Sequence, residues 1–287
     1  MAKCPPTLSK LVLILKIPVL TYHSINVIKN TYLENDHLAL ASDLKTIDDL
    51  GFHVIPLSRV VDWHQGVLSD EEIAKSVAIT LDDGSWFDYY DLDHPTCGVQ
   101  RSMINILKDF NCRENHTFKA HATSFVISSP DARSSLDKSC MIGKDWWGDE
   151  WWVGANSSGV MDVECHSWDH VHTELDHVAQ QNQIKGDFSK VESFVDCEFQ
   201  FTKACEYIGS ILGGKRPSLF AYPYGTVSNY VVNNYLPNYF FRHQLKAAFT
   251  TEPKAVSKSD NIWRLPRFVF GHDWKSPEEL ESILNGV

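Results

Sequence analysis

Two adjacent carboxylates stand at the end of an apolar run. The run "VAITL" is followed directly by Asp82, Asp83 and Gly84. Successive side chains of a strand point to opposite faces, so the two carboxylates are expected to point in different directions. One of them can then bind a metal ion while the other accepts a proton. The alternative is an Asp-Gly turn that caps a following helix, which is a common role of this dipeptide.

Two histidines lie four residues apart in "HSWDH", at His166 and His170. This spacing predicts that both imidazoles lie on one side of a helical turn. Two neutral imidazoles and one carboxylate make up the ligand set of many catalytic zinc sites, which leave one position open for water. The alternative is a pair of surface or hydrogen-bonded histidines, because His172 and His177 show that the whole stretch is rich in histidine.

The carboxylate pair and the histidine pair are far apart in the sequence, so only the fold can bring them together. The chain alternates between strand-like and helix-like stretches. The predicted strands cover residues 11–20, 52–57, 76–81, 122–127, 161–165, 218–222, 247–251 and 267–271, and the predicted helices cover residues 38–50, 60–66, 99–110 and 190–212. Repeated alternation predicts a parallel sheet, and this chain length favours a closed or partly closed (β/α) barrel in a single domain spanning residues 1–287.

Catalytic side chains of such barrels collect where the strands end. Polar or turn residues follow four of the predicted strands, at His23, Asp82–Asp83, His166 and Tyr222–Gly225. The sequence therefore predicts that four distant segments share one mouth.

Composition excludes some classes of function. The formal net charge is -11 and no long run of Lys or Arg occurs, which argues against a nucleic-acid partner. The apolar run from Leu11 to Leu20 contains Lys16 and Pro18 and is too short to cross a bilayer, so we expect no transmembrane segment. Seven cysteines without CxxC spacing favour reduced thiols and a cytoplasmic location.

The motifs "TLDDG", "HSWDH" and "FAYPYG", in this order, resemble the signature motifs of the polysaccharide deacetylase family, also called carbohydrate esterase family 4 or the NodB-homology family. The resemblance covers roughly residues 17–270. It implies a distorted seven-stranded (β/α) barrel and a metal-dependent hydrolase that removes N-acetyl groups from an N-acetylated sugar or polysaccharide. The products would be acetate and a free amine, and the cofactor would be a divalent metal ion, with Zn²⁺ the first choice.

The resemblance also implies roles for individual residues. The first Asp of the "DDG" motif is the general base in this family and the second is a metal ligand, together with two histidines. Carried over residue by residue, Asp82 becomes the base, and Asp83, His166 and His170 become the metal ligands.

The general acid has two candidates. "PVLTYHSI" resembles family members that deacetylate poly-N-acetylglucosamine, in which the acid comes early, and this implies His23. The rival is His272 in "FGHDW", because many other members carry the acid near the C-terminus.

"FAYPYG" departs from the commoner family pattern, which has an Arg where this chain has Ala221. In "WRLPRF", Arg267, or with less support Arg264, is expected to orient Asp82 and keep it ionised, since a nearby cation lowers a carboxylate pKa. The alternative is an ordinary pair of surface arginines. By the same resemblance, the backbone N–H of Tyr224 is the expected oxyanion donor.

An insertion at about residues 128–160 contains "DWWGDEWW". Dense Trp in a Gly-bearing loop predicts a platform for stacking on sugar rings, and a buried anchor for the loop is the equal alternative. The expected substrate contacts are Trp147, Trp151, Trp152, Trp168 and Tyr222.

Two other functions fit the same sequence. The first is a metal-dependent amidase that acts on a small amide or a lipid-linked sugar, because the fold does not settle the substrate. The second is a non-catalytic glycan-binding protein, for which the Ala221 substitution is the hint.

Overall fold

A parallel sheet forms the centre of the computed structural model, which describes residues 15–112, 119–179 and 182–287. The strands are β1 (Val19–Tyr22), β2 (His53–Val54), β3 (Ser76–Leu81), β6 (Ala122–Val126), β7 (Met161–Cys165), β8 (Leu219–Ala221), β9 (Ala247–Phe249) and β10 (Phe268–Val269), and a separate antiparallel hairpin consists of β4 (Leu92–His94) and β5 (Gly98–Gln100). Seven strands follow the order β10-β1-β3-β6-β7-β8-β9, and β2 pairs with β3. A parallel bridge between Phe249 and Leu265 joins β9 to the segment that leads into β10. The strands thus curve into the expected distorted seven-stranded (β/α) barrel.

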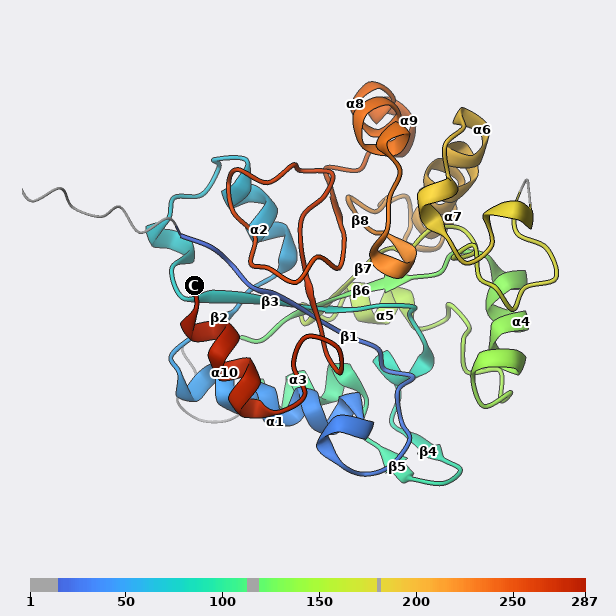
Figure 1. Cartoon of the computed structure of the whole chain (residues 1–287). Helices are drawn as coiled ribbons and strands as arrows, with labels where there is room; N and C mark the ends of the chain where they lie inside the picture. The colour runs from blue at the N-terminus through green and yellow to red at the C-terminus, as the bar shows by residue number, and fades with distance from the viewer. Residues whose placement is uncertain (1–14, 113–118, 180–181) are drawn as a thin grey trace, which may run out of the picture.

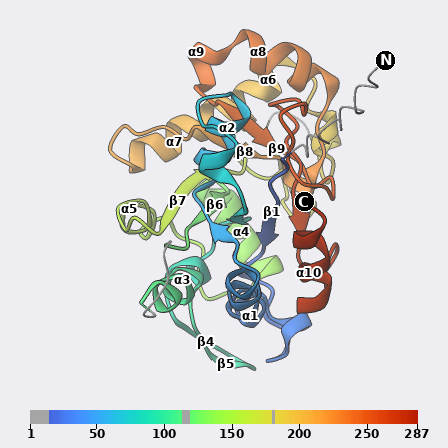
Figure 2. The ribbon, with the colours of Figure 1, turned by 90° about the vertical axis from the view of Figure 1, so that its left-hand side faces the viewer.

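Helices surround the strands. They are α1 (Asp36–Asp49), α2 (Leu57–His64), α3 (Met103–Asn111), α4 (Pro130–Cys140), α5 (Trp152–Asn156), α6 (Phe194–Cys197), α7 (Ala204–Ile211), α8 (Leu236–Asn238), α9 (Phe240–His243) and α10 (Pro277–Asn285). Short helical segments are η1 (Tyr32–Glu34), η2 (Glu71–Ile73), η3 (Trp86–Asp88), η4 (Asn182–Ile184), η5 (Phe188–Lys190), η6 (Glu198–Lys203), η7 (Pro223–Gly225) and η8 (Val231–Tyr235). Figure 1 shows α1, α3 and α10 together below the sheet, with α6, α8 and α9 above it. Figure 2 shows the helices arranged around the strands.

The barrel interior is a packed core with a polar layer at one end. Alternation along β3 sends Val77 and Ile79 to the outer core under the helices, whereas Ala78 joins the inner core. The inner core contains Val19, Ala78, Phe125, Leu219, Ala221, Ala247, Phe249 and Leu265, together with Leu57, Val60 and Val61 of α2. At the other end of the barrel, the hydroxyls of Thr21 and Thr80 lie 2.9 Å apart. The candidate catalytic residues therefore lie at the polar end of the barrel, with the apolar inner core beneath them.

Most of the predicted elements are present, with shifted ends. The predicted strands at 76–81 and 161–165 match β3 and β7, while residues 11–14 of the first predicted strand lie outside the described residues. The start of the predicted helix at 99–110 is wrong, because residues 98–100 pair in the hairpin and Ser102 caps α3 by accepting the Asn105 N–H. None of the described helices combines the length and apolarity needed to cross a membrane.

Candidate active site

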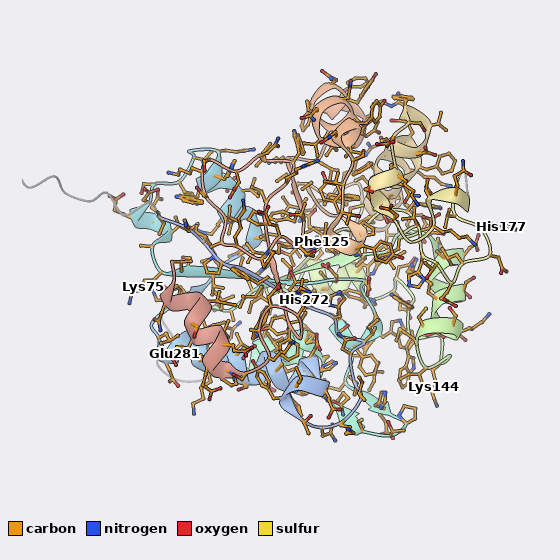
Figure 3. All side chains as sticks on the ribbon, viewed as in Figure 1. Lys75, Phe125, Lys144, His177, His272 and Glu281 are labelled. Carbon is orange, nitrogen blue, oxygen red and sulfur yellow. The ribbon has the colours of Figure 1, made fainter. Side chains whose placement is uncertain are left out.

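The strand ends and the loops after them surround one cavity of about 460 Å³. Its lining residues are His23, Asp82, Asp83, His166, His170, Tyr224, Gly225, Thr251, Val269 and His272. Figure 3 shows the labelled His272 over the middle of the sheet, whereas Lys75, Lys144 and Glu281 lie toward the edges of the molecule. The segments that the sequence predicted to share one mouth therefore meet there.

Asp83, His166 and His170 form a cluster of potential metal ligands. One donor atom from each residue lies within 4.8 Å of the other two. The Nε2 atoms of His166 and His170 are each 3.6 Å from Oδ1 of Asp83. Tetrahedral ligands with bonds of about 2.1 Å to zinc lie about 3.4 Å apart, so the cluster fits one ion with little adjustment.

The protonation of the two imidazoles also fits a metal. Nδ1 of His166 lies 2.8 Å from the carbonyl oxygen of Ala221, which can only accept, so this nitrogen carries the proton and Nε2 keeps its lone pair. Burial, followed by the neighbouring imidazoles of His166 and His172, holds the pKa of His170 well below its ordinary value. Both rings are thus available as neutral ligands.

The geometry of the histidine pair differs from the prediction. The "HSWDH" segment is a loop and not a helical turn, because Ser167 and His170 adopt φ values of 72° and 61°. The Ser167 hydroxyl accepts the His170 N–H at 2.9 Å and so closes the loop locally. The two rings meet with centroids 5.0 Å apart. A tight loop, and not the predicted helical turn, therefore brings the two imidazoles together.

A sharp turn after β3 separates the two carboxylates. Asp83 adopts a φ of 76° and Gly84 a φ of 75°. A Cβ on Gly84 would lie only 2.4 Å from Cγ1 of Val126, so the chain passes β6 where only glycine fits. The Asp-Gly pair does not cap a helix itself, because Ser85 is the residue that caps η3. The turn points Asp83 toward the imidazoles and leaves Asp82 over the barrel.

Asp82 forms a buried two-point ion pair with Arg267. Nη1 and Nη2 of Arg267 lie 2.7 and 2.8 Å from Oδ1 and Oδ2 of Asp82. Burial by itself raises the pKa of Asp82, but opposing interactions, of which the charge of Arg267 is the largest, hold the pKa well below its ordinary value. Asp82 is therefore ionised, as a general base must be.

Arg267, and not Arg264, is the arginine that contacts Asp82. Its side chain is fully buried and its guanidinium lies 5.4 Å from the ring centre of Phe125, which Figure 3 labels over the middle of the sheet. Arg264 instead donates to Asn229. Ala221 is buried in β8. The segment after β9 thus supplies the cation that the motif at Ala221 lacks.

Both candidates for the general acid line the cavity. The backbone N–H of His23 donates to Oδ2 of Asp36 at 2.7 Å, and burial raises the pKa of Asp36 to about 7. The His272 side chain is 83% exposed, and its Nδ1 lies 2.7 Å from Oδ1 of Asp273. The assignment of the acid to His23 stays a prediction.

Three of the four tryptophans of the insertion are buried and do not form an exposed platform. Trp147, Trp151 and Trp152 are 4%, 1% and 0% exposed, so the expected sugar contacts of all three are wrong and the buried-anchor alternative holds. The indole of Trp152 instead lies against the guanidinium of Arg133, at 4.9 Å from ring centre to Cζ. Aromatic faces packed in this way cannot stack on a sugar.

The other two aromatic residues expected to contact substrate, Tyr222 and Trp168, contact other parts of the protein instead. Tyr222 is fully buried and its hydroxyl donates to the carbonyl of Trp263, which contradicts a contact with substrate. Trp168 is half-buried, with Nζ of Lys203 3.8 Å from its ring centre and Tyr207 against it edge-on.

Two residues that line the cavity were not predicted from the sequence. Thr251 and Val269 both line the cavity. A Cβ on Gly225 would lie 1.9 Å from Oγ1 of Thr251, so the loop after β8 packs directly on the loop after β9. Thr251 ends the predicted strand at 247–251, and the positional rule for barrels would have selected it, whereas Val269 lies in the middle of the predicted strand at 267–271 and ends a strand only in the structure.

Comparisons with known proteins agree with this geometry. The sequence model of the polysaccharide deacetylase family matches residues 69–236, more than half of the chain. The deacetylase PplD from Streptococcus pyogenes, solved in complex with acetate, superimposes with a TM-score of 0.61 at 18% identity, covering 94% of this chain and 99% of that one.

Two further solved structures share the fold. IcaB from Ammonifex degensii has a TM-score of 0.59 at 15% identity, covering 94% of this chain and 96% of its own. The BpsB deacetylase domain from Bordetella bronchiseptica has a TM-score of 0.58 at 15% identity, covering 89% and 96%. A search of curated protein sequences found no significant match.

The matched region contains Asp82, Asp83, His166 and His170, whereas His23 and Arg267 lie outside it. Since the family match spans over half of the chain and includes this cluster, the chain belongs to the polysaccharide deacetylase family and is a hydrolase that acts on non-peptide carbon–nitrogen bonds.

Proposed function

We propose that this protein is a metal-dependent N-deacetylase that removes acetyl groups from N-acetylated sugar units of a polysaccharide, releasing acetate and a free amine. The observation that carries the proposal is the cluster of Asp83, His166 and His170 beside an ionised Asp82 in one cavity. Family membership supports the reaction, and the donor set supports the metal dependence. We further propose that residues 1–287 form one catalytic domain.

Zinc is the proposed ion, because two imidazoles and one carboxylate are typical ligands of catalytic zinc. When bound there, such an ion polarises a carbonyl oxygen and lowers the pKa of water toward ~7. Nε2 of His166 and Nε2 of His170 would hold it together with Oδ1 of Asp83.

The remaining steps belong to groups of the protein itself. Asp82 takes a proton from the water that attacks the acetamide carbon, and Arg267 holds both carboxylate oxygens in place while it does so. The backbone N–H of Tyr224 donates to the developing oxyanion. Two observations support this role: Tyr224 lines the cavity, and its ring lies 4.7 Å from that of His170. Protonated His23 donates to the departing amine.

The test combines metal analysis with product analysis. Purified protein is dialysed against Zn²⁺, its bound metal is counted, and acetate release from N-acetylglucosamine oligomers is measured. Asp82→Asn is expected to keep one equivalent of metal and lose at least 10²-fold in turnover, because a general base contributes about 10²–10⁴-fold. The control is Asp93→Asn, which changes an exposed carboxylate of β4 and leaves both quantities unchanged.

Two outcomes would contradict the proposal. If the wild-type protein binds no metal, the ligand cluster has been misassigned. If it binds metal and releases formate or ammonia from small amides but no acetate from glycans, it is an amidase with a different substrate.

A further inference from the structure

One of the buried indoles of the insertion contacts the metal-ligand turn. Nε1 of Trp147 donates to the backbone carbonyl of Asp83 at 3.1 Å. The Nε1 atoms of Trp151 and Trp152 are equally buried, yet they find no acceptor among the described residues. Three neighbouring indoles thus share their burial, and Trp147 is distinguished by where its N–H points.

The carbonyl that accepts this N–H belongs to a residue with an unfavourable backbone conformation. Asp83 has a φ of 76°, which is uncommon for a residue with a side chain and persists only where its surroundings hold it. Its carbonyl accepts a second hydrogen bond, from the Ile127 N–H at 3.2 Å. Two donors from different segments therefore fix the peptide plane that follows Asp83, and with it the direction of the carboxylate.

Trp147 is itself held firmly from α4. Nη1 of the buried Arg133 donates to the Trp147 carbonyl at 2.7 Å, and Nη2 pairs with Oδ2 of Asp149 at 2.7 Å. Tyr207 donates to the same Asp149 oxygen at 2.6 Å. The indole N–H is thus a pre-positioned donor, since the main chain that carries it is bound to a buried arginine.

We propose that Trp147 is a positioning residue for metal binding, which acts on the ligand Asp83 through its main-chain carbonyl. This inference rests on the proposed metal site. It gives the Trp-rich insertion a role in the reaction different from sugar contact: the insertion holds the carboxylate ligand toward His166 and His170. Loss of a partner that orients a metal ligand typically weakens metal affinity by 10–100-fold. We expect a loss of about 10-fold here, because the hydrogen bond acts through the backbone and not on the ligating oxygen.

The test compares two matched variants. Trp147→Phe and Trp151→Phe each remove one buried indole and leave a phenyl ring, but the first alone removes a hydrogen bond to the turn. The Kd for Zn²⁺ is measured by competition with a chromophoric chelator, and thermal melting of the metal-free protein reports on folding. We expect Trp147→Phe to raise the Kd about 10-fold. Trp151→Phe should leave the Kd unchanged although its melting temperature falls by a similar amount.

A second replacement separates the N–H from the shape of the ring. Benzothienylalanine at position 147 puts sulfur in place of the indole N–H and keeps both rings, so it serves even if Trp147→Phe fails to fold. It should weaken Zn²⁺ binding as Trp147→Phe does. If it binds Zn²⁺ like the wild type, or if both phenylalanine variants change the Kd equally, the inference is overturned. If the wild-type protein binds no Zn²⁺, the proposed metal site fails instead.

Discussion

Removal of the Arg267 guanidinium tests the electrostatic design of the site most directly. Arg267→Met keeps a long apolar stem and deletes the charge that contacts both oxygens of Asp82. It also removes the donors to the Thr250 carbonyl at 3.2 Å and the Thr80 hydroxyl at 3.1 Å. The variant leaves the Asp82 carboxylate in place without its strongest partner.

The expected cost follows from burial. Asp82 is 4% exposed and Arg267 is 0% exposed, so the lost contact belongs to a largely desolvated pair. Breaking a buried pair by removing one partner costs about 3–5 kcal/mol, and we expect Arg267→Met to lower the free energy of unfolding by this amount. Arg267→Lys keeps the charge but not the two-point fork, and should cost about 1–3 kcal/mol, the range for one buried group left unsatisfied.

The double variant Asp82→Asn/Arg267→Met supplies the control. It removes the stranded charge together with its partner, so it should be more stable than Arg267→Met alone. Unfolding free energies are measured by urea titration of the metal-free proteins at pH 7, and acetate release is measured on the same preparations. All three variants should lose activity, because Asp82 is either absent or no longer oriented.

Two results would refute this reasoning. The first is an Arg267→Met protein whose unfolding free energy lies within about 1 kcal/mol of the wild type, the range of an exposed ion pair. The second is a double variant no more stable than Arg267→Met, which would show that an unpaired Asp82 is not the source of the loss.

Two further predictions concern titratable side chains. Burial lowers the pKa of His243 to about 4, whereas the pKa of a histidine in the unfolded chain is ~6.5. As the pH falls, the unfolded chain therefore takes up the proton first. The stability due to neutral His243 is lost between pH ~6.5 and about 4. His243→Gln should flatten the fall of the unfolding free energy over this range in urea titrations, and an unchanged slope would contradict the assignment. His23→Gln should lower kcat by about 10²–10⁴-fold, the contribution of a general acid, whereas His272→Gln should have a much smaller effect. The opposite ranking of the two kcat values would assign the acid to His272.

The sequence by itself determined the parts of this protein that depend on local pattern. The run "SVAITL" marked β3, which is buried along its whole length in the structure, and the strand-helix alternation was enough to predict the barrel. The two carboxylates after β3 and the histidine pair after β7 were recognisable because a barrel gathers strand ends at one mouth. Residue type and position along a strand, both legible in the sequence, carried these inferences.

Tertiary structure alone decided which long-range partners these groups have. Arg267 and Asp82 are 185 residues apart, and their pairing depends on the segment after β9 closing the barrel against β1, which no local pattern encodes. The same holds for Trp147, whose hydrophobic indole fitted an exposed platform and a buried anchor equally well in the sequence. The hydrogen bonds from Arg133 to its carbonyl and from its indole N–H to Asp83 hold it inside, and both depend on tertiary contacts that bring distant segments together.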